Sequence, residues 1–289
     1  MAKKDLPVYS IKKFQQFEET DEFYANNISR HLKEHHFILT PHKHDFYLVV
    51  LFTHGSGTHE IDFINYKVEP GSVFLLRPGQ MHNWKLSKDI EGYVFFHTKE
   101  FYDSRSVTEN IQDYPFFNSI HNPPLILLKN KSLEKIIGLF SEIKNEYEET
   151  NLLKTQKLHA QITVIYIELT RLYKIKQQTE KQSYLSKLRE LEDLIDLNYK
   201  IIKYPFEYAA KMTMSEKHLN RICKTCLNKT TTDLITDRIV LEAKRLLTHS
   251  KLTISQVAEE LGYLDNSYFT RLFKKKTGET PGEFVKRNR

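Results

Sequence analysis

The sequence predicts a multidomain α+β protein, in which an antiparallel β-barrel and a helical segment precede an all-α domain. Residues 30–128 carry short aromatic and β-branched runs between turns, a spacing typical of a closed or double-sheet barrel. Residues 184–289 twice repeat two short helical patterns around a tight turn. We therefore place the domains at 1–130 (barrel), 131–176 (helical pair), 177–183 (polar linker) and 184–289 (all-α).

The barrel prediction depends on four apolar runs and the turn residues between them. Gly55, Gly57, Pro70-Gly71 and Pro78-Gly79 separate the runs. The predicted strands are Asp45–Phe52, Gly57–Phe63, Ser72–Leu76 and Tyr93–His97.

Two amphipathic helices should follow the barrel. We expect Ser132 to cap the first helix, which runs to about Glu149, and the second to span about 152–176. The second carries apolar residues at alternating steps of four and three, as in a heptad seam: Leu158, Ile162, Ile165, Leu169 and Leu172. Such a stripe either packs inside the monomer or forms a dimer interface.

The all-α domain shows the same two-helix unit twice. In the second unit Gly262 separates a helix over 254–261 from one over 266–277, with Asp265 as N-cap and Gly278 after the end. Thr280–Glu283 then reads as a capping box. The upstream unit comprises 206–212 and 215–225, and a connecting helix over 232–248 joins the two.

The second helix of each unit is basic and polar on its outer face, which is typical of helices that enter the major groove of double-stranded DNA. Residues 180–289 hold 21 Lys and Arg against 15 Asp and Glu, whereas the rest of the chain is balanced at 22 each. This excess fits phosphate binding. The candidate DNA-binding residues are Lys217, His218, Asn220, Arg221, Lys224, Asn266, Ser267, Thr270, Arg271, Lys274 and Lys275.

The carboxy-terminal motifs closely resemble those of the AraC/XylS family of bacterial transcription regulators. They include Val257-Ala258, Gly262-Tyr263, Ser267-Tyr268-Phe269 and Thr280-Pro281. The resemblance implies a double helix-turn-helix that reads successive major grooves, dimerisation through helices like 152–176, and RNA polymerase as a further candidate partner.

The amino-terminal region resembles the cupin-like sensor domain of the same family. The motifs are Pro41–Tyr47, Gly55-Ser56-Gly57, Pro70-Gly71 and Pro78–His82. This resemblance implies a small-molecule effector bound in the barrel. The candidate effector-binding residues are His42, His44, Tyr47, His82 and Trp84.

A cupin metal site needs two His and a Glu from its first motif and one His from its second. His42, His44 and His82 fill three of these places, but no Glu follows His44 at the required distance. We therefore favour a pocket lining or strand-end hydrogen bonds for these histidines and predict no metal, cofactor or catalytic residue. The alternatives are a cupin-type metalloenzyme with a DNA-binding tail and an architectural DNA binder with an effector-free barrel.

Composition fits a cytoplasmic protein. No apolar stretch approaches the roughly 18 residues of a membrane helix, and the first residues lack the apolar core of a signal peptide. The chain has 2 cysteines, too few for a disulfide framework.

Overall fold

The computed structural model describes residues 6–14, 22–105, 110–119, 121–173 and 182–288. Contacts divide the chain into two compact units: the described residues from 7 to 173 form the first, and those from 182 to 288 belong to the second. Most of the predicted linker lies outside the described residues. Its last two residues, Gln182 and Ser183, instead begin helix α5 (Gln182–Asn198).

The first unit is built from short strands with few helices between them. The strands are β1 (Val8–Tyr9), β2 (Phe23–Asn27), β3 (Lys43–His44), β4 (Tyr47–His54), β5 (Gly57–Ile61), β6 (Ile64–Val68), β7 (Ser72–Leu76), β8 (His82–Leu86), β9 (Glu91–His97) and β10 (Leu125–Leu127). The short helices are η1 (Ile11–Phe14), α1 (Ile28–Glu34), η2 (His36–Leu39), α2 (Lys99–Asp103) and η3 (Ile111–Asp113).

The strands form the double-sheet variant of the predicted barrel. One antiparallel sheet has the order β10-β7-β4-β9-β2, the other has the order β6-β5-β8, and β1 pairs with β3 in parallel. Side chains of both antiparallel sheets share one core, which includes Val50, Ile61, Phe74 and Trp84. The two sheets therefore face each other across this inner core.

Strand β4 shows why the central sequence is apolar without interruption. Successive side chains of a strand point to opposite faces. Leu48, Val50 and Phe52 enter the inner core, whereas Tyr47 and Val49 enter a second core on the outer face of the five-stranded sheet. Both faces of the sheet are therefore covered.

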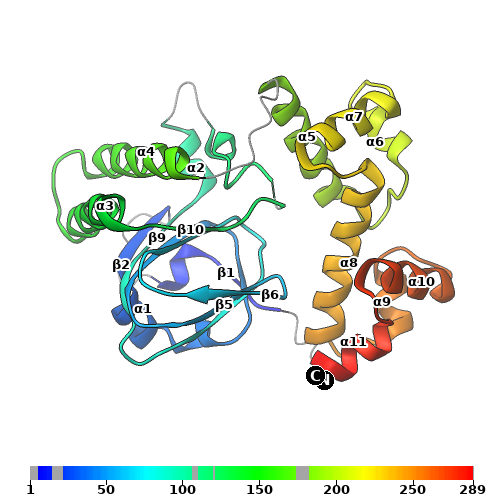
Figure 1. Cartoon of the computed structure of the whole chain (residues 1–289), viewed down its shortest axis with the longest axis horizontal. Coiled ribbons are helices and arrows are strands. Elements are labelled where there is room, and N and C mark those ends of the chain that lie inside the picture. Colours follow the sequence, from blue (N-terminus) through cyan, green and yellow to red (C-terminus); the bar gives the residue numbers. More distant parts are fainter. Residues whose placement is uncertain (1–5, 15–21, 106–109, 120, 174–181, 289) are drawn as a thin grey trace. The chain divides into compact units, whose positions relative to one another are not determined.

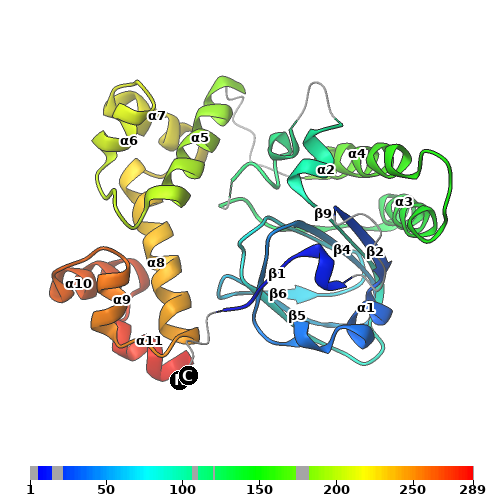
Figure 2. The same cartoon turned by 180° about the vertical axis from the view of Figure 1, so that it is seen from behind.

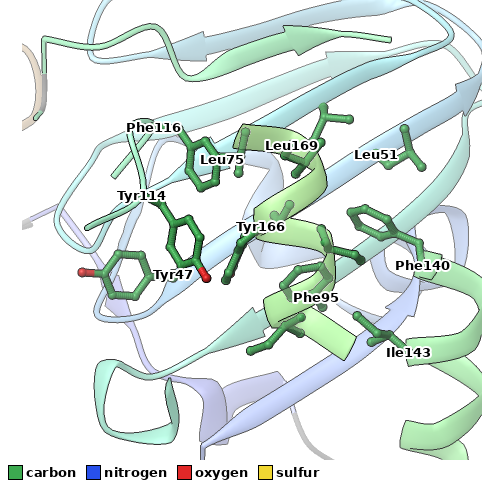
Figure 3. Packing of buried hydrophobic residues seen from close by; sticks show 14 of the residues in the cluster. Tyr47, Leu51, Leu75, Phe95, Tyr114, Phe116, Phe140, Ile143, Tyr166 and Leu169 are labelled. Atoms are coloured by element: carbon green, nitrogen blue, oxygen red, sulfur yellow. The ribbon is translucent and has the colours of Figure 1, made fainter. Parts of the chain in front are cut away.

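Helices α3 (Asn130–Glu148) and α4 (Lys154–Leu172) cover that outer face, as Figures 1 and 2 show. The start of α3 differs from the prediction, because Lys129 is the N-cap and the Ser132 hydroxyl donates to the Lys129 carbonyl (2.7 Å). Figure 3 shows Tyr166 and Leu169 packed against the sheet beside Phe95 and Leu75.

The predicted dimer seam on α4 is wrong for four of its five residues. Leu158, Ile162, Ile165 and Leu169 are at most 3% exposed and belong to the core between α4 and the sheet. A partner chain cannot reach them without unpacking the monomer. Leu172, at the end of α4, is 36% exposed.

The second unit is entirely helical. It comprises α5, α6 (Pro205–Lys211), α7 (Glu216–Leu227), α8 (Thr231–His249), α9 (Ile254–Glu260), α10 (Asn266–Thr277) and α11 (Pro281–Asn288). Both views show α8 between two groups of helices, with α6 and α7 near one end and α9 and α11 near the other. Buried side chains of α8, among them Leu234, Ile239 and Ala243, connect the groups.

None of the helices within the described ranges is long and apolar enough to cross a membrane.

Candidate nucleic-acid interface and ligand site

Helices α6 and α7 form the first helix-turn-helix. The turn passes through Thr213, whose φ of 54° is unusual for a residue other than glycine. Ser215 then begins α7, because its hydroxyl accepts a hydrogen bond from the His218 amide (3.2 Å). Asn228 ends α7 in the left-handed conformation, with a φ of 54°. Both predicted caps of α7 are present.

Helices α9 and α10 form the second helix-turn-helix. Gly262 turns the chain at a φ of 79°, and the Asp265 carboxylate accepts hydrogen bonds from the Ser267 (2.7 Å) and Tyr268 (3.1 Å) amides. Gly278 ends α10 at a φ of 84°. These local signals are the ones that the sequence predicted.

The outer faces of α7 and α10 present the predicted DNA-binding side chains. Phe269 and Phe273 anchor α10, and Leu219 and Ile222 anchor α7, since all are buried. Most of the candidates lie on the opposite, exposed side of these helices, and three are partly buried: His218, Asn220 and Thr270.

Asn220, one of the predicted base-contacting residues, makes a hydrogen bond within the protein. The Asn220 side-chain oxygen accepts a hydrogen bond from the Thr231 amide (3.1 Å), at the start of α8. This amide is one of the donors that a helix N-terminus leaves without an intrahelical partner. Asn220 therefore holds α7 against α8, and its availability to DNA is reduced.

Three further residues lie at this surface and were not among the predicted candidates. Tyr184 of α5 lies under the recognition helix, with its ring 6.0 Å from the Arg221 guanidinium carbon and 6.0 Å from the His218 ring. Leu264, fully exposed, and Tyr268, 51% exposed, flank the start of α10. Apolar side chains at such a position can contact the thymine methyl group. The signal available in the sequence was an apolar Leu264 between the turn glycine Gly262 and the N-cap Asp265.

Four buried imidazole and indole side chains meet inside the double sheet. The ring of His82 lies 4.4 Å from that of His42, 4.9 Å from that of His44 and 5.0 Å from that of Trp84. The structure therefore brings together four of the five predicted effector-binding residues. All four are at most 4% exposed.

His59 of β5 completes the cluster and was not predicted. Its Nε2 atom lies 3.0 Å from Nδ1 of His82, and strand pairing places it opposite Trp84. Only the register between β5 and β8 brings the two histidines together, so no linear motif marks His59.

Tyr47 was predicted in this site but lies on the other face of the sheet. Its ring stacks on His97 at 5.6 Å, and the Tyr166 hydroxyl of α4 donates to His97 Nε2 at 2.6 Å. The side-chain alternation along β4 separates Tyr47 from the histidine cluster.

Burial keeps the histidines of the cluster neutral. Desolvation lowers the pKa of His44 to about 3, and it lowers the pKa values of His59 and His82 well below their usual range. The neighbouring imidazoles lower them further. Among the described residues no carboxylate or cation contributes to these three shifts.

Hydrogen bonds fix the proton positions. His42 Nδ1 and His44 Nδ1 each face a backbone carbonyl, that of Thr40 (2.8 Å) and of Phe46 (3.0 Å), so each Nδ1 carries the proton. The neutral His44 therefore presents a lone pair at Nε2. His44 Nε2, His59 Nδ1, His82 Nε2 and Trp84 Nε1 are buried, and no described residue hydrogen-bonds to them.

No three His, Cys, Asp or Glu side chains in the described parts of the chain are arranged to hold a metal ion. Because burial disfavours the charged rings, the cluster is a set of neutral hydrogen-bonding groups inside an apolar core. Each unsatisfied polar atom costs about 1–3 kcal/mol there.

Comparison with known proteins matches both units. The AraC-like ligand binding domain matches residues 27–161, and a helix-turn-helix domain matches residues 208–287. The transcriptional activator RhaR of Enterobacter sp. (strain 638) is 22% identical over 258 residues, which cover 87% of this chain and 89% of that protein. The uncharacterized regulator YfiF of Bacillus subtilis (strain 168) is 25% identical over 259 residues, covering 86% and 79%.

Among solved structures, ToxT from Vibrio cholerae aligns with 91% of this chain and 98% of its own, at 14% identity and a TM-score of 0.46. The order of domains, a ligand-binding double sheet and then two helix-turn-helix units, defines a ligand-responsive DNA-binding regulator. The chain belongs to the AraC family of transcriptional regulators.

Proposed function

We propose that the chain binds a specific duplex DNA through α7 and α10, with Arg221 and Arg271 reading bases. The observation that carries this proposal is the pair of capped recognition helices, each with an exposed arginine on its outer face. Arginine can donate two hydrogen bonds to guanine O6 and N7. The exposed lysines beside them, Lys224, Lys274 and Lys275, would contact phosphates.

Selection from a randomised duplex pool by the full-length protein tests this proposal. The expected product is a bipartite sequence with two short blocks about one helical turn apart. Recovery of duplexes without a common sequence would contradict it.

We further propose that the effector is an uncharged molecule with hydroxyl or amide groups, bound at the histidine cluster. His44 Nε2 is an acceptor and Trp84 Nε1 a donor, and the shared proton of the His59–His82 pair leaves one donor and one acceptor. A hydroxyl or amide group can both donate and accept. A carboxylate would bring an unpaired charge into an apolar core, which is costly.

Thermal-shift screening of the full chain against uncharged polyols and amides and, separately, carboxylates tests the class of effector. We expect stabilisation by an uncharged compound and a change in the fluorescence of Trp84, the single tryptophan. His44→Ala and His82→Ala should each weaken binding, while His54→Ala, at an exposed position, should not. Binding that survives both cluster variants would place the effector elsewhere.

The relatives RhaR and YfiF are named as transcriptional regulators, which favours this function over the enzyme alternative. We therefore propose that the chain is not an enzyme. We also propose that it acts in the cytoplasm as a homodimer, as the family resemblance implies. RNA polymerase stays a candidate partner.

A further inference from the structure

The segment between α5 and α6 contacts the second helix-turn-helix directly. The Lys203 ammonium donates one hydrogen bond to the Tyr199 carbonyl, just after α5, and one to the Leu261 carbonyl (2.6 Å), which caps α9. Helix carboxyl ends carry partial negative charge, so a cation placed between two of them is attracted to both. Lys203 therefore connects a helix of the first half of the unit to a helix of the second half.

Two neighbouring contacts make this junction close. A side chain at Gly262 would place its Cβ only 2.0 Å from the Lys200 carbonyl oxygen, so the two backbones touch there. Lys200 also pairs with Glu260 (2.6 Å), and the Lys203 ammonium lies 4.8 Å from the centre of the Tyr263 ring. We call the set Lys200, Lys203, Glu260, Leu261 and Gly262 the brace.

A second link joins the same two halves at another point. The Lys276 ammonium of α10 contacts Asp233 (2.7 Å) and Asp237 (3.0 Å) near the start of α8. Helix α10 is therefore held to α8, and α9 is held to the segment after α5. The brace therefore adds to α8 and this ion pair a direct contact between the segment after α5 and α9.

We propose that Lys203 is a positioning residue, which fixes the distance and angle between α7 and α10 and thereby the spacing of the half-sites that the protein accepts. The protein gains affinity from both blocks of a bipartite site only if α7 and α10 can contact their blocks at the same time. With a flexible junction, the protein would bind duplexes of several block spacings, each with lower affinity. With a rigid junction, it binds tightly at one block spacing. This inference rests on the proposed DNA reading by both helices.

A purely structural role for Lys203 makes a different prediction. Loss of stability would lower binding to every duplex by the same factor, because it would only reduce the fraction of folded protein. Loss of positioning lowers binding to the two-block duplex and leaves binding to a single block unchanged. The ratio between duplexes therefore separates the two roles.

The test uses the full-length protein and three duplexes: the one selected from the randomised pool, the same with one base pair inserted between blocks, and the same with one block scrambled. Lys203→Met keeps the length of the side chain and removes the charge. We expect about tenfold weaker binding to the selected duplex, unchanged binding to the scrambled one, and a smaller penalty for the inserted base pair. Lys203→Arg should restore most of the spacing preference, since it keeps the charge.

Lys251→Met is the matched control, because Lys251 is exposed in the same unit and its replacement removes the same charge.

Glu260→Gln is the second variant. It removes the charge that pairs with Lys200 at a half-exposed position and keeps the shape of the side chain, so the protein should fold. A smaller loss of spacing preference is expected. If Lys203→Met does not fold, Glu260→Gln decides. An unchanged spacing preference, or an equal loss of affinity on all three duplexes, would overturn the proposal. Failure of the wild-type protein to select any duplex would instead contradict the proposed DNA binding by α7 and α10.

Discussion

At the scale of single residues, the two proposed binding surfaces have opposite chemistry. Arg221 and Arg271 are exposed charges on helices, whereas His44 and His82 are neutral rings at most 1% exposed. Exposed charge suits binding to a polyanion, and buried neutral groups suit a small uncharged ligand. Substitutions at the two surfaces should therefore have separable effects.

Replacing Arg271 should cost specificity as well as affinity. We expect Arg271→Ala to lose about 1–3 kcal/mol of binding to the selected duplex and to accept other bases at one position. Lys275→Ala is the comparison, because loss of a phosphate contact should weaken selected and random duplexes equally. Binding titrations with both duplexes measure this. An equal loss on both duplexes for Arg271→Ala would remove the base contact from this residue.

The buried histidines should make the sensor unit sensitive to acid. Burial lowers the pKa of His44 to about 3 and that of His97 to about 4, from 6.5. Below pH 6.5 these histidines bind protons in the unfolded chain but not in the folded chain. The free energy of unfolding therefore falls as pH falls. Each of the two histidines should contribute up to about 1.4 kcal/mol per pH unit, down to its folded pKa.

Urea unfolding of the full chain at pH 7, 6 and 5 measures this dependence. His97→Gln should reduce the slope, while His54→Gln, at an exposed position, should leave it unchanged. A sensor unit equally stable at pH 7 and pH 5 would show that these rings are protonated in the folded state.

At the scale of elements, local signals were predicted well and long-range pairing was not. The caps Ser215, Asp265 and Gly278 act within a few residues, so the sequence around them contains the whole signal. Strands β6 (INYKV) and β8 (HNWKL) were missed because they alternate apolar with polar residues, whereas the prediction relied on apolar runs. His59 was missed for a related reason, since its partnership with His82 depends on which strands pair.

The α4 stripe shows the limit of periodicity. A heptad pattern indicates that one face of a helix is buried, but it does not indicate which part of the protein, or which partner, buries that face. Here the five-stranded sheet covers it. The apolar residues of α4 that stay exposed are Val164 (43%), Ile167 (38%) and Leu172 (36%), and these are the candidates for a dimer contact.

Charged replacements on the two faces of α4 should behave differently. We expect Val164→Asp with Ile167→Asp to give a folded monomer, since both positions are exposed. Ile162→Asp should unfold the sensor unit, because it buries an unpaired charge. Sedimentation and circular dichroism distinguish these results. A double variant that stays dimeric would place the interface away from this face.

At the scale of the molecule, both the order of the two units and the paired helix-turn-helix were predictable from motifs. The arrangement inside the helical unit was not, because the brace joins residues far apart in sequence, such as Lys203 and Leu261, which are 58 positions apart. Helix α8 has 19 residues, a length of roughly 28 Å at 1.5 Å per residue. This is comparable to the roughly 34 Å between successive major grooves on one face of DNA.

Changing the spacing of the two DNA blocks should therefore abolish binding to both at once. Insertion of five base pairs turns the second block to the opposite face of the duplex, and insertion of ten moves it a full turn away. We expect both duplexes to bind no better than one with a scrambled block. Gel-shift titration measures this, and strong binding to the ten-base-pair insertion would mean that the two units can separate.

Strand β4 has a consequence for how this protein can change over evolutionary time. Its residues Tyr47–Phe52 are at most 2% exposed on either face. A polar substitution at any of the six positions is buried and costly, so selection should remove it whatever ligand the protein responds to. The exposed positions of α7 and α10 can change whenever the recognised DNA changes. Among distant relatives, we therefore expect sequence similarity to be retained longest in this strand, which takes no part in DNA binding.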